Sequence, residues 1–427
     1  MSSERPIKIL SLGLGQSNFL NQLYGSMKRQ RENLSFNIDR FRDISEGVIS
    51  QEASVFDNYY DFADHQPKGL DLYLSFLKVL TKRFFWKYLR YERKKGASLS
   101  ELVSFIKKQS RYQDIVDHKL LPLNFDIYHF HFCTPYNLRY VPFLPKNVAT
   151  ICSFWGSDLY RNFDKDHIFY VSDALKYATA VTIQTPEMGE NALSKYGGGF
   201  EKTLHYSKFT ISEEIYQIMD AMIGNKTAIE QFKAQWNIPL NATVITIGYN
   251  ANEAFSHKEI INELQKLAPS EKSKICCVLP LTYSKDGVYL DNLNTFIDAI
   301  NDLQIVKIQH FLSHKDLALL RLATDIQVQL PSSDALSGSV TEVMYAGNTV
   351  IAGSWLPYAE FRRCGLHFLS IDTIDELIPA IKEIMTKPEL IKEQNRENAK
   401  QVAAHFFPKQ TTPNWVSLYE QCMLFKK

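Results

Sequence analysis

The sequence predicts an α/β protein with two doubly wound domains, each a parallel sheet covered by helices. The first observation is that short apolar stretches alternate with helical stretches between residues 244 and 352, joined by short links. Such alternation is typical of parallel sheets, because each crossover needs a helix. The second is the start of the chain, where an apolar strand over residues 7–14 runs into a glycine loop and a helical segment. The third is size, since 427 residues, 45% of them hydrophobic, suffice for two cores.

The domain limits follow from a change in the chain after Ile211, where it becomes helical and polar before a new apolar strand begins. Pro408 separates a last helical segment from what precedes it, and we expect this helix to pack away from the second domain. The expected parts are an α/β domain over residues 1–210, a linker with helix over 211–240, a second α/β domain over 241–407 and a C-terminal helix over 408–427.

Composition limits the classes of function. Lys+Arg 48 against Asp+Glu 47 gives a net charge of +1, so global charge does not favour nucleic acid as a partner. The apolar run near the start is too short for a signal peptide, and no segment reaches the ~18 apolar residues of a membrane span, which makes a cytoplasmic protein the default. We expect reduced, mostly buried thiols and no metal site, because the cysteines lack metal-ligand spacing. The cysteines are Cys133, Cys152, Cys276, Cys277, Cys364 and Cys422.

Residues 70–112 carry eleven basic side chains against three acidic ones, with aromatic residues interleaved. An interfacial helix on anionic lipid has this composition, because cations contact headgroups while aromatic rings lie at the acyl boundary. We therefore expect peripheral contact with the inner face of a cell membrane. The alternative is an amphipathic helix whose aromatic side chains are core and whose cations are solvated. The residues expected at the membrane are Lys82, Arg83, Phe85, Trp86, Lys87 and Arg90.

Three segments of the first domain offer candidate ligand contacts. Gly13 and Gly15 follow the first strand without the third glycine of the dinucleotide fingerprint, so this loop either faces a ligand or only permits a tight turn. His129 and His131 share one face of a short strand, where they either position a sugar and exchange a proton or belong to the core. No third ligand appears at metal spacing, which excludes zinc. Asp158 follows another apolar strand as a helix cap or as a carboxylate facing an acceptor.

Residues 330–355 contain the best candidate anion site. An alternating strand ends at Leu330, a loop of Pro, Ser and Asp follows, and we expect a helix from Ser339 to Ala346 before a buried strand. The small residues Ser337, Gly338 and Ser339 leave backbone N–H groups accessible at the helix start. The positive end of the helix macrodipole favours anions there.

Two carboxylates flank this small-residue segment. Asp334 precedes the helix, Glu342 lies one turn inside it, and seven residues separate them. A diphosphate bound to the amides, with hydroxyl groups donating to Glu342, suits a nucleotide sugar. The alternative is structural, because any Gly/Ser turn before a helix offers such amides and Asp334 could be a turn or N-cap residue.

The segment SSDALSGSVTEVMYAGNTVIAGSWLPYAEF resembles the donor-binding element of retaining GT-B glycosyltransferases. The resemblance implies two doubly wound Rossmann-like domains facing a cleft, with the C-terminal helix crossing back. It also implies that Glu342 binds the nucleotide ribose and that the amides near Ser337 bind the diphosphate. Asp334 stands where the family usually has its first Glu. In the first domain, the loop from Gly13 to Gln16, the strand end with His131 and the segment FWGSDLY resemble the corresponding parts of the family.

The loop after the first strand of the second domain extends the resemblance. Lys258 matches the family's phosphate-neutralising Lys, whereas Tyr249 and Asn250 follow Gly248 where the family has Arg. The stretches IGYNANEAFSHKEIINEL and LPLTYSKDGVYLDNL also resemble the bacterial transferase that adds an acetamido-dideoxygalactose to a lipid-linked disaccharide. The donor contacts implied by the resemblance are Gly15, Gly248, Asn250, Lys258, Tyr283, Ser337, Gly338, Ser339 and Glu342.

The resemblance implies metal-independent transfer of a sugar from a nucleoside-diphosphate sugar to a hydroxyl of a glycan or lipid-linked acceptor, in bacterial surface polysaccharide or glycoconjugate synthesis. Lys258 and Asp334 are the expected catalytic groups of the second domain. Inversion would need a base, for which His131 or Asp158 is the first choice, whereas in retention the leaving phosphate can take the acceptor proton. The acidic pair favours retention, and the lipid-linked relative favours inversion. The rival functions are a non-catalytic GT-B-like partner subunit and a nucleotide-sugar epimerase.

Overall fold

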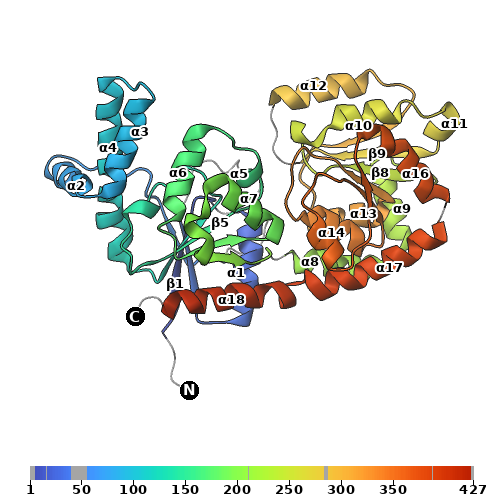
Figure 1. Cartoon of the computed structure of the whole chain (residues 1–427). Helices are drawn as coiled ribbons and strands as arrows, with labels where there is room; N and C mark the ends of the chain where they lie inside the picture. The colour runs from blue at the N-terminus through green and yellow to red at the C-terminus, as the bar shows by residue number, and fades with distance from the viewer. Residues whose placement is uncertain are drawn as a thin grey trace. The chain divides into compact units, whose positions relative to one another are not determined.

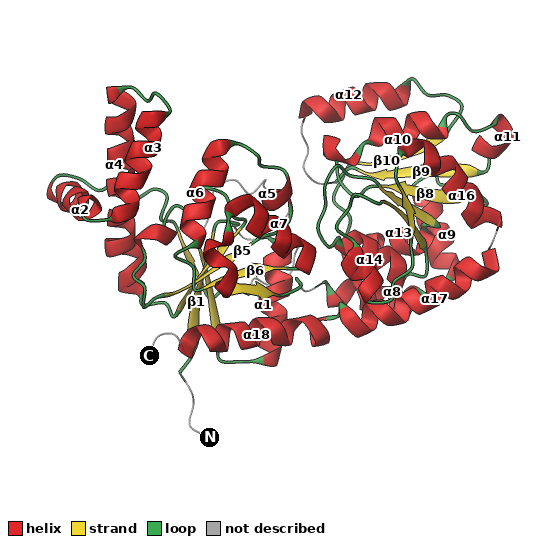
Figure 2. Cartoon of the chain, in the orientation of Figure 1, coloured by secondary structure: helices red, strands yellow, loops and turns green. Residues whose placement is uncertain are grey.

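The computed structural model describes residues 5–15, 17–39, 55–209, 211–282, 287–386 and 388–424. The chain divides into two compact units, each built around one parallel sheet (Figure 1). The first unit comprises Met1–Phe209 with Thr412–Lys427, and the second comprises Thr210–Thr411. Helices flank the strands of both units (Figure 2), so the predicted pair of doubly wound α/β domains is confirmed.

The first unit has a seven-stranded sheet in the order β3-β2-β1-β4-β5-β6-β7, and every strand pair is parallel. The strand order reverses between β1 and β4, and in this architecture ligands bind in the crevice at the carboxyl ends of such a strand pair. The strands are β1 (Ile7–Leu12), β2 (Leu34–Asp39), β3 (Asn58–Tyr60), β4 (Ile127–His131), β5 (Ala149–Ser153), β6 (Ala180–Ile183) and β7 (Leu204–Tyr206).

Local sequence explains how the first strand passes into the first helix. Gly13 adopts φ +97°, and a Cβ atom there would lie 2.4 Å from the carbonyl oxygen of His131, so only glycine fits. Ser17 then caps α1 by accepting a hydrogen bond from the N–H of Leu20 at 3.3 Å. The helices of this unit are α1 (Asn18–Gln30), α2 (Leu70–Leu80), α3 (Arg83–Lys94), α4 (Leu99–Ile115), α5 (Ser157–Tyr160), α6 (Lys165–Leu175) and α7 (Pro186–Tyr196).

The last helix, α18 (Pro408–Leu424), completes the core of the first unit. Trp415, Leu418, Tyr419 and Cys422 are buried with apolar side chains of α1, β1, β2 and β4. The indole N–H of Trp415 donates to the carbonyl of Lys208 at 2.8 Å. The expectation that the C-terminal helix crosses back to the first domain is therefore confirmed.

The second unit has a six-stranded parallel sheet in the order β10-β9-β8-β11-β12-β13, which reverses between β8 and β11. Its strands are β8 (Thr243–Ile247), β9 (Ile275–Pro280), β10 (Gln304–Ile308), β11 (Ile326–Gln329), β12 (Thr349–Gly353) and β13 (Leu369–Ile371). Its helices are α8 (Glu213–Met222), α9 (Lys226–Gln235), α10 (His257–Leu264), α11 (Pro269–Lys272), α12 (Gly287–Asp298), α13 (His314–Ala323), α14 (Gly338–Tyr345), α15 (Ala359–Arg363), α16 (Leu377–Thr386) and α17 (Pro388–His405).

The segment expected as a linker, residues 211–240, contributes α8 and α9 to the second unit. Ile215, Tyr216 and Met219 of α8 are buried together with apolar side chains of α14 and β12. The Tyr216 hydroxyl donates to Thr341 Oγ1 at 3.1 Å. These two helices therefore belong to the domain structure.

The basic aromatic segment forms α2, α3 and α4, which pack beside one another in the first unit (Figure 1). Phe85 of α3 is fully buried, and the Lys87 ammonium pairs with Asp173 while lying 5.1 Å from the ring centroid of Phe169. The buried Phe85 ring is therefore not available to a membrane in this structure, whereas Lys87 is exposed and its membrane contact stays a prediction. Lys82 is half-buried, and Arg83, Trp86 and Arg90 are exposed.

Helix α2 differs from α3, because its apolar face is turned to solvent. Leu70, Tyr73, Leu74 and Leu77 are all exposed, at the i, i+3, i+4 and i+7 spacing of one helical face. Ser75 and Val79 are the buried side chains of α2. An apolar stripe left uncovered on a helix marks an interaction surface.

All six cysteines are buried and unpaired, as expected. Among the described residues, no helix is both long and apolar enough to cross a bilayer.

Candidate functional site

The first unit encloses the two histidines of β4 in a hydrogen-bonded network. The Tyr24 hydroxyl lies 2.6 Å from His131 Nε2 and 3.2 Å from His129 Nδ1. His129 Nδ1 also lies 2.6 Å from the Tyr419 hydroxyl, and its Nε2 lies 2.6 Å from Ser153 Oγ. Neither ring is exposed, and burial lowers the pKa of His131 to about 3. In this structure the His131 ring is enclosed, and a role for it as the base for an acceptor stays a prediction.

Asp158 is equally enclosed. Its carboxylate accepts hydrogen bonds from the backbone N–H groups of Cys133, Trp155, Gly156 and Leu159 at 2.7–3.1 Å. The carboxylate therefore ties the loop after β4 to the loop after β5. Burial raises the pKa of Asp158 to about 6, while the four N–H groups act in the opposite direction. These four bonds agree with the structural alternative for Asp158, and its catalytic role stays a prediction. Gly15 is buried in the loop between β1 and α1.

In the second unit, two loops meet at the carboxyl ends of β8 and β11. The N–H of Gly248 donates to the carbonyl of Val328 at 3.0 Å, and the N–H of Ser332 donates to the carbonyl of Ala254 at 2.7 Å. Gly248 adopts φ +61°, and a Cβ atom there would lie 2.8 Å from the ring of Phe255. These contacts place the small-residue segment of the sequence beside the strand-order reversal, where ligands bind in this architecture.

Helix α14 begins in this crevice without a side-chain cap. Ser337 is its N-cap residue, with φ −73° and ψ 122°, but its hydroxyl accepts no backbone N–H. Ser337 is only 5% exposed, and its Oγ has no hydrogen-bond partner among the described residues. Ser339 Oγ, by contrast, accepts from Gln327 Nε2 at 2.9 Å. The first turn of α14 thus begins without a side-chain cap, beside a buried hydroxyl, and helix starts of this kind favour anions.

Asp334 holds the loop that leads into α14. Its carboxylate accepts from Gln329 Nε2 at 2.8 Å, from the Tyr358 hydroxyl at 2.7 Å and from the N–H of Ala335 at 2.8 Å. Burial and the neighbouring Asp334 charge together raise the pKa of Tyr358 well above its usual value. Asp334 therefore holds the loop before α14 in place, and its direct role in catalysis stays a prediction.

Glu342 lies inside α14 and forms an ion pair with α13. Its Oε2 accepts from Arg321 Nε at 2.8 Å, and the two side chains are 11% and 4% exposed respectively. This pair holds the carboxylate toward the helix layer. Ribose binding by Glu342 remains a prediction. A ribose hydroxyl would have to share the Glu342 carboxylate with Arg321.

The remaining predicted donor contacts lie after β8. The Lys258 ammonium lies 5.9 Å from the ring centroid of Phe296, and no carboxylate of the described residues pairs with it. Asn250 Oδ1 accepts from the N–H of Asn252 at 2.9 Å and so shapes the loop. A contact between Lys258 and an anionic donor stays a prediction. Tyr283 lies outside the described residues.

Solved structures that resemble this chain share one architecture. HepE of Anabaena in complex with UDP and glucose superposes with a TM-score of 0.65 at 14% identity, covering 98% of each chain. A glycosyltransferase from Rickettsia africae gives 0.66 at 11% identity over 98% of this chain and 99% of that one. Sucrose-phosphate synthase from Thermosynechococcus elongatus gives 0.65 at 12% identity over 99% and 100%. The chain has the GT-B fold. No protein-family model and no curated protein sequence matches it.

Several buried polar residues around the start of α14 and the loop after β8 were not singled out from the sequence. Gln327 and Gln329 share one face of β11 and are fully buried, and the motif IQVQ signals them as polar residues within an otherwise apolar strand. His257, at the start of α10, is also buried, and its Nδ1 lies 2.9 Å from the Tyr289 hydroxyl. No sequence pattern singles out Arg321, because its pairing with Glu342 is seen only in the folded structure. In the described part of the chain, no group of three or more His, Cys, Asp or Glu side chains is placed to hold a metal ion.

Proposed function

We propose that this GT-B protein is a glycosyltransferase that moves a sugar from a nucleoside-diphosphate sugar to an acceptor hydroxyl. The observation that carries the proposal is the uncapped start of α14, where the buried Ser337 hydroxyl has no partner among the described residues. The likeness to HepE solved with UDP and glucose agrees with a uridine nucleotide as the first donor to test. Lys258, without a carboxylate partner in the described residues, supplies a positive charge in the same unit.

The proposed chemistry is stabilisation of the leaving group. As the sugar–phosphate bond breaks, negative charge grows on the departing diphosphate. Preorganised backbone N–H groups and a cation stabilise that charge more strongly in the transition state than in the substrate. In this proposal the amides of Gly338 and Ser339 with the ammonium of Lys258 perform that task, and Asp334 positions them.

Some group must accept the proton of the acceptor hydroxyl, whether the reaction inverts or retains the configuration of the sugar. Both candidate bases of the first unit, His131 and Asp158, are enclosed and already hydrogen-bonded. We therefore assign the proton to a phosphate oxygen of the leaving diphosphate, which corresponds to retention of configuration.

A non-catalytic partner subunit is the second candidate, and two observations favour it. Arg321 holds Glu342, the residue to which the family resemblance gives the ribose. Tyr249 and Asn250 occupy the loop where the family has an arginine. Such a subunit would bind a nucleotide sugar without releasing nucleoside diphosphate, so binding and turnover measured together separate the two functions.

The test uses a matched pair of variants at Gly338, the first residue of α14. Proline is tolerated at this position of a helix, and the extended conformation of Ser337 is compatible with a following proline. Gly338→Pro removes one backbone N–H, whereas Gly338→Ala keeps it, and no atom lies within 4 Å of the added Cβ position. Loss of one such donor should lower kcat by about 100-fold or more.

Nucleoside diphosphate release is measured from a panel of nucleotide sugars, beginning with UDP-glucose. We expect turnover in the parent and in Gly338→Ala, and its loss in Gly338→Pro at unchanged thermal stability. Equal turnover of the two variants would contradict the assignment of α14 to the diphosphate. Donor binding without any release by the parent would favour the partner subunit.

We also propose that the protein works at an anionic membrane surface on a glycan or lipid-linked acceptor, in polysaccharide or glycoconjugate synthesis on the cytoplasmic side. The exposed leucines of α2 support this proposal, together with the basic side chains of the neighbouring helices α3 and α4. An apolar helix face beside cations is complementary to acyl chains below anionic headgroups. The lipid-facing residues in this proposal are Leu70, Tyr73, Leu74 and Leu77, which replace the buried Phe85 and the ion-paired Lys87.

A further inference from the structure

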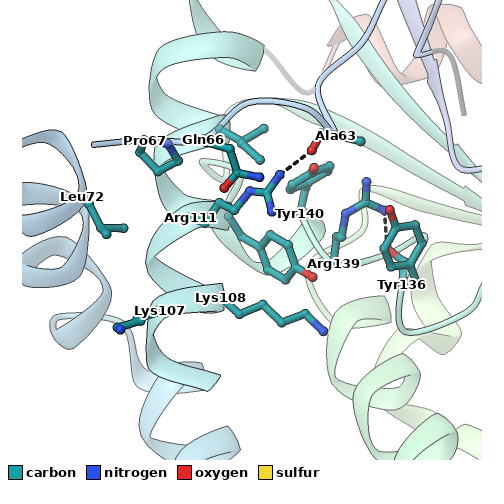
Figure 3. Close-up of a pocket in the computed structure, with 12 residues that line it drawn as sticks. Ala63, Gln66, Pro67, Leu72, Lys107, Lys108, Arg111, Tyr136, Arg139 and Tyr140 are labelled. Atoms are coloured by element: carbon teal, nitrogen blue, oxygen red, sulfur yellow. Dashed lines mark hydrogen bonds between the residues drawn. The ribbon is translucent and has the colours of Figure 1, made fainter. Parts of the chain in front are cut away.

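A pocket of about 460 Å³ opens between α4, the first turn of α2 and two loops of the first unit (Figure 3). One of these loops follows β3 and the other follows β4. The pocket therefore lies at the carboxyl ends of the strands, on the side of the sheet where this architecture binds ligands. Its lining residues all belong to the first unit, whereas α14 belongs to the second. Its lining includes Ala63, Gln66, Leu72, Tyr112, Tyr136 and Tyr140.

All charged side chains that line this pocket are positive. Lys107, Lys108, Arg111 and Arg139 line it, and no Asp or Glu does. Arg111 is occupied by the loop after β3, because its Nε donates to the carbonyl of His65 at 2.9 Å and its Nη2 donates to the carbonyl of Ala63. The other three cations have no carboxylate partner among the described residues. Uncompensated cations around a concave surface attract an anionic ligand.

Arg139 is the best-positioned of these cations. Its guanidinium stacks 3.9 Å from the ring centroid of Tyr136 and 4.3 Å from that of Tyr140, and its Nη1 donates to the Tyr136 carbonyl at 2.6 Å. Burial raises the pKa of Asp39 to about 6, and the positive charge of Arg139 acts in the opposite direction. The two side chains do not form an ion pair in the described structure. A planar guanidinium held by aromatic rings is suited to bidentate binding of phosphate.

The lysines differ in direction. Lys107 and Lys108 leave α4 toward opposite sides, and Lys108 extends toward the side of Tyr136 and Arg139 (Figure 3). Its ammonium lies 5.9 Å from the ring centroid of Tyr112. Lys108 and Arg139 thus frame one part of the pocket, and Leu72 of α2 forms another part, next to the leucines that α2 exposes.

We propose that this pocket binds the phosphate groups of an anionic acceptor, with Arg139 and Lys108 as their ligands. The chemistry is that of a diphosphate or phosphate ester. Leu72 and the exposed face of α2 offer an apolar path beside it, which suits an acceptor whose diphosphate carries an isoprenyl chain. Naming the ligand an acceptor rests on the proposed transferase function, whereas the phosphate binding itself does not.

The experiment measures binding by calorimetry with full-length protein carrying Gly338→Pro, which weakens the anion site proposed in the second unit. The probes are inorganic diphosphate, farnesyl diphosphate and vesicles of anionic phospholipid. Lys108→Gln and Arg139→Gln test the pocket, and Lys94→Gln removes an exposed cation of α3 that does not line it. Each pocket variant should weaken diphosphate binding about tenfold, by loss of a charge-assisted contact, and added salt should weaken it in the parent.

Tighter binding of farnesyl diphosphate than of inorganic diphosphate, lost in both pocket variants, would identify a lipid-linked acceptor. Equal binding of the two probes with the same loss would identify a phosphate-bearing acceptor without a lipid. Diphosphate binding that is the same in the pocket variants and in Lys94→Gln would overturn the proposal. Vesicle binding lost in these variants, with no diphosphate binding, would also overturn it and assign the pocket to membrane headgroups.

The separate turnover assay with Gly338→Ala and Gly338→Pro reports on the transferase function. Diphosphate binding in a protein that releases no nucleotide would support the phosphate pocket and refute only its role in binding an acceptor. If Arg139→Gln fails to fold, Lys108→Gln still tests the proposal, because its side chain is exposed on α4.

Discussion

Replacing the leucines of α2 should release the protein from anionic membranes. The variant carries Leu70→Gln, Leu74→Gln and Leu77→Gln, which keep a good helix former at each position. These leucines are 69%, 46% and 41% exposed, equivalent to about one and a half whole side chains. Burying one leucine side chain is worth ~1.5–3 kcal/mol, so the face contributes about 2–5 kcal/mol. Loss of this face should lower the partition coefficient of the protein onto anionic vesicles by a factor between roughly 30 and several thousand.

Flotation with vesicles of anionic and of neutral phospholipid measures this effect. A matched control carries Leu240→Gln, Leu390→Gln and Leu424→Gln, which are 56%, 51% and 67% exposed but lie outside α2. We expect the parent and the control to float with anionic vesicles and the α2 variant to remain behind. All three proteins should unfold at similar urea concentrations, because the changed side chains are exposed. An α2 variant that floats like the parent, or a parent that never floats, would refute the assignment of α2 to lipid.

Two further predictions concern buried charge. Glu342→Gln leaves the Arg321 charge buried without its partner and should lower the free energy of unfolding in urea by about 3–5 kcal/mol. The double variant Arg321→Met/Glu342→Leu should recover most of that loss, because neither charge remains buried. A Glu342→Gln protein as stable as the parent would contradict the ion pair. Burial lowers the pKa of His131 from 6.5 to about 3, so the neutral ring stabilises the fold above pH 6.5 and this contribution is lost as the pH falls. Between pH 6 and pH 4 the parent should therefore lose about 1.4 kcal/mol per pH unit more than His131→Gln, and parallel stability curves would show that the ring is not buried and neutral.

The local order of elements was readable from the sequence around the small-residue segment. The expected helix over Ser339–Ala346 is α14 at Gly338–Tyr345, and the expected strand after it is β12 at Thr349–Gly353. Apolar periodicity and the Pro, Gly and Ser residues between the elements specify these boundaries locally. The regular alternation predicted a parallel sheet, but the reversal of strand order between β8 and β11 is a property of the whole sheet and was not specified by it.

The roles of single side chains were much less accessible. Asp158 and His131 look like candidate bases in a strand-end motif, and only the fold shows that four backbone N–H groups and a tyrosine, respectively, already engage them. The pairing of Glu342 with Arg321 joins residues of α14 and α13, a contact for which spacing along the chain gives no sign. Burial and partners come from tertiary packing, so the sequence supplied the residue types of the site without their states.

The basic aromatic segment shows the same limit at the level of helices. Composition over residues 70–112 indicated an amphipathic surface but could not tell which apolar face the protein covers itself. Phe84 and Tyr88 of α3 pack against Phe143 and Phe169 respectively, while α2 keeps its leucines outside. The residues chosen from the sequence as membrane contacts all lie between 82 and 90, whereas the exposed apolar face is that of α2.

The return of α18 to the first unit has a consequence for synthesis of the protein. Trp415, Leu418 and Tyr419 belong to the core formed by β1, β2 and β4, so that core is incomplete until these residues have left the ribosome. The second unit is contiguous in the chain and can fold earlier, although it is translated after most of the first. Until then the nascent first unit exposes the apolar surface that α18 later covers, and a chaperone that holds this surface during translation would raise the yield of folded protein.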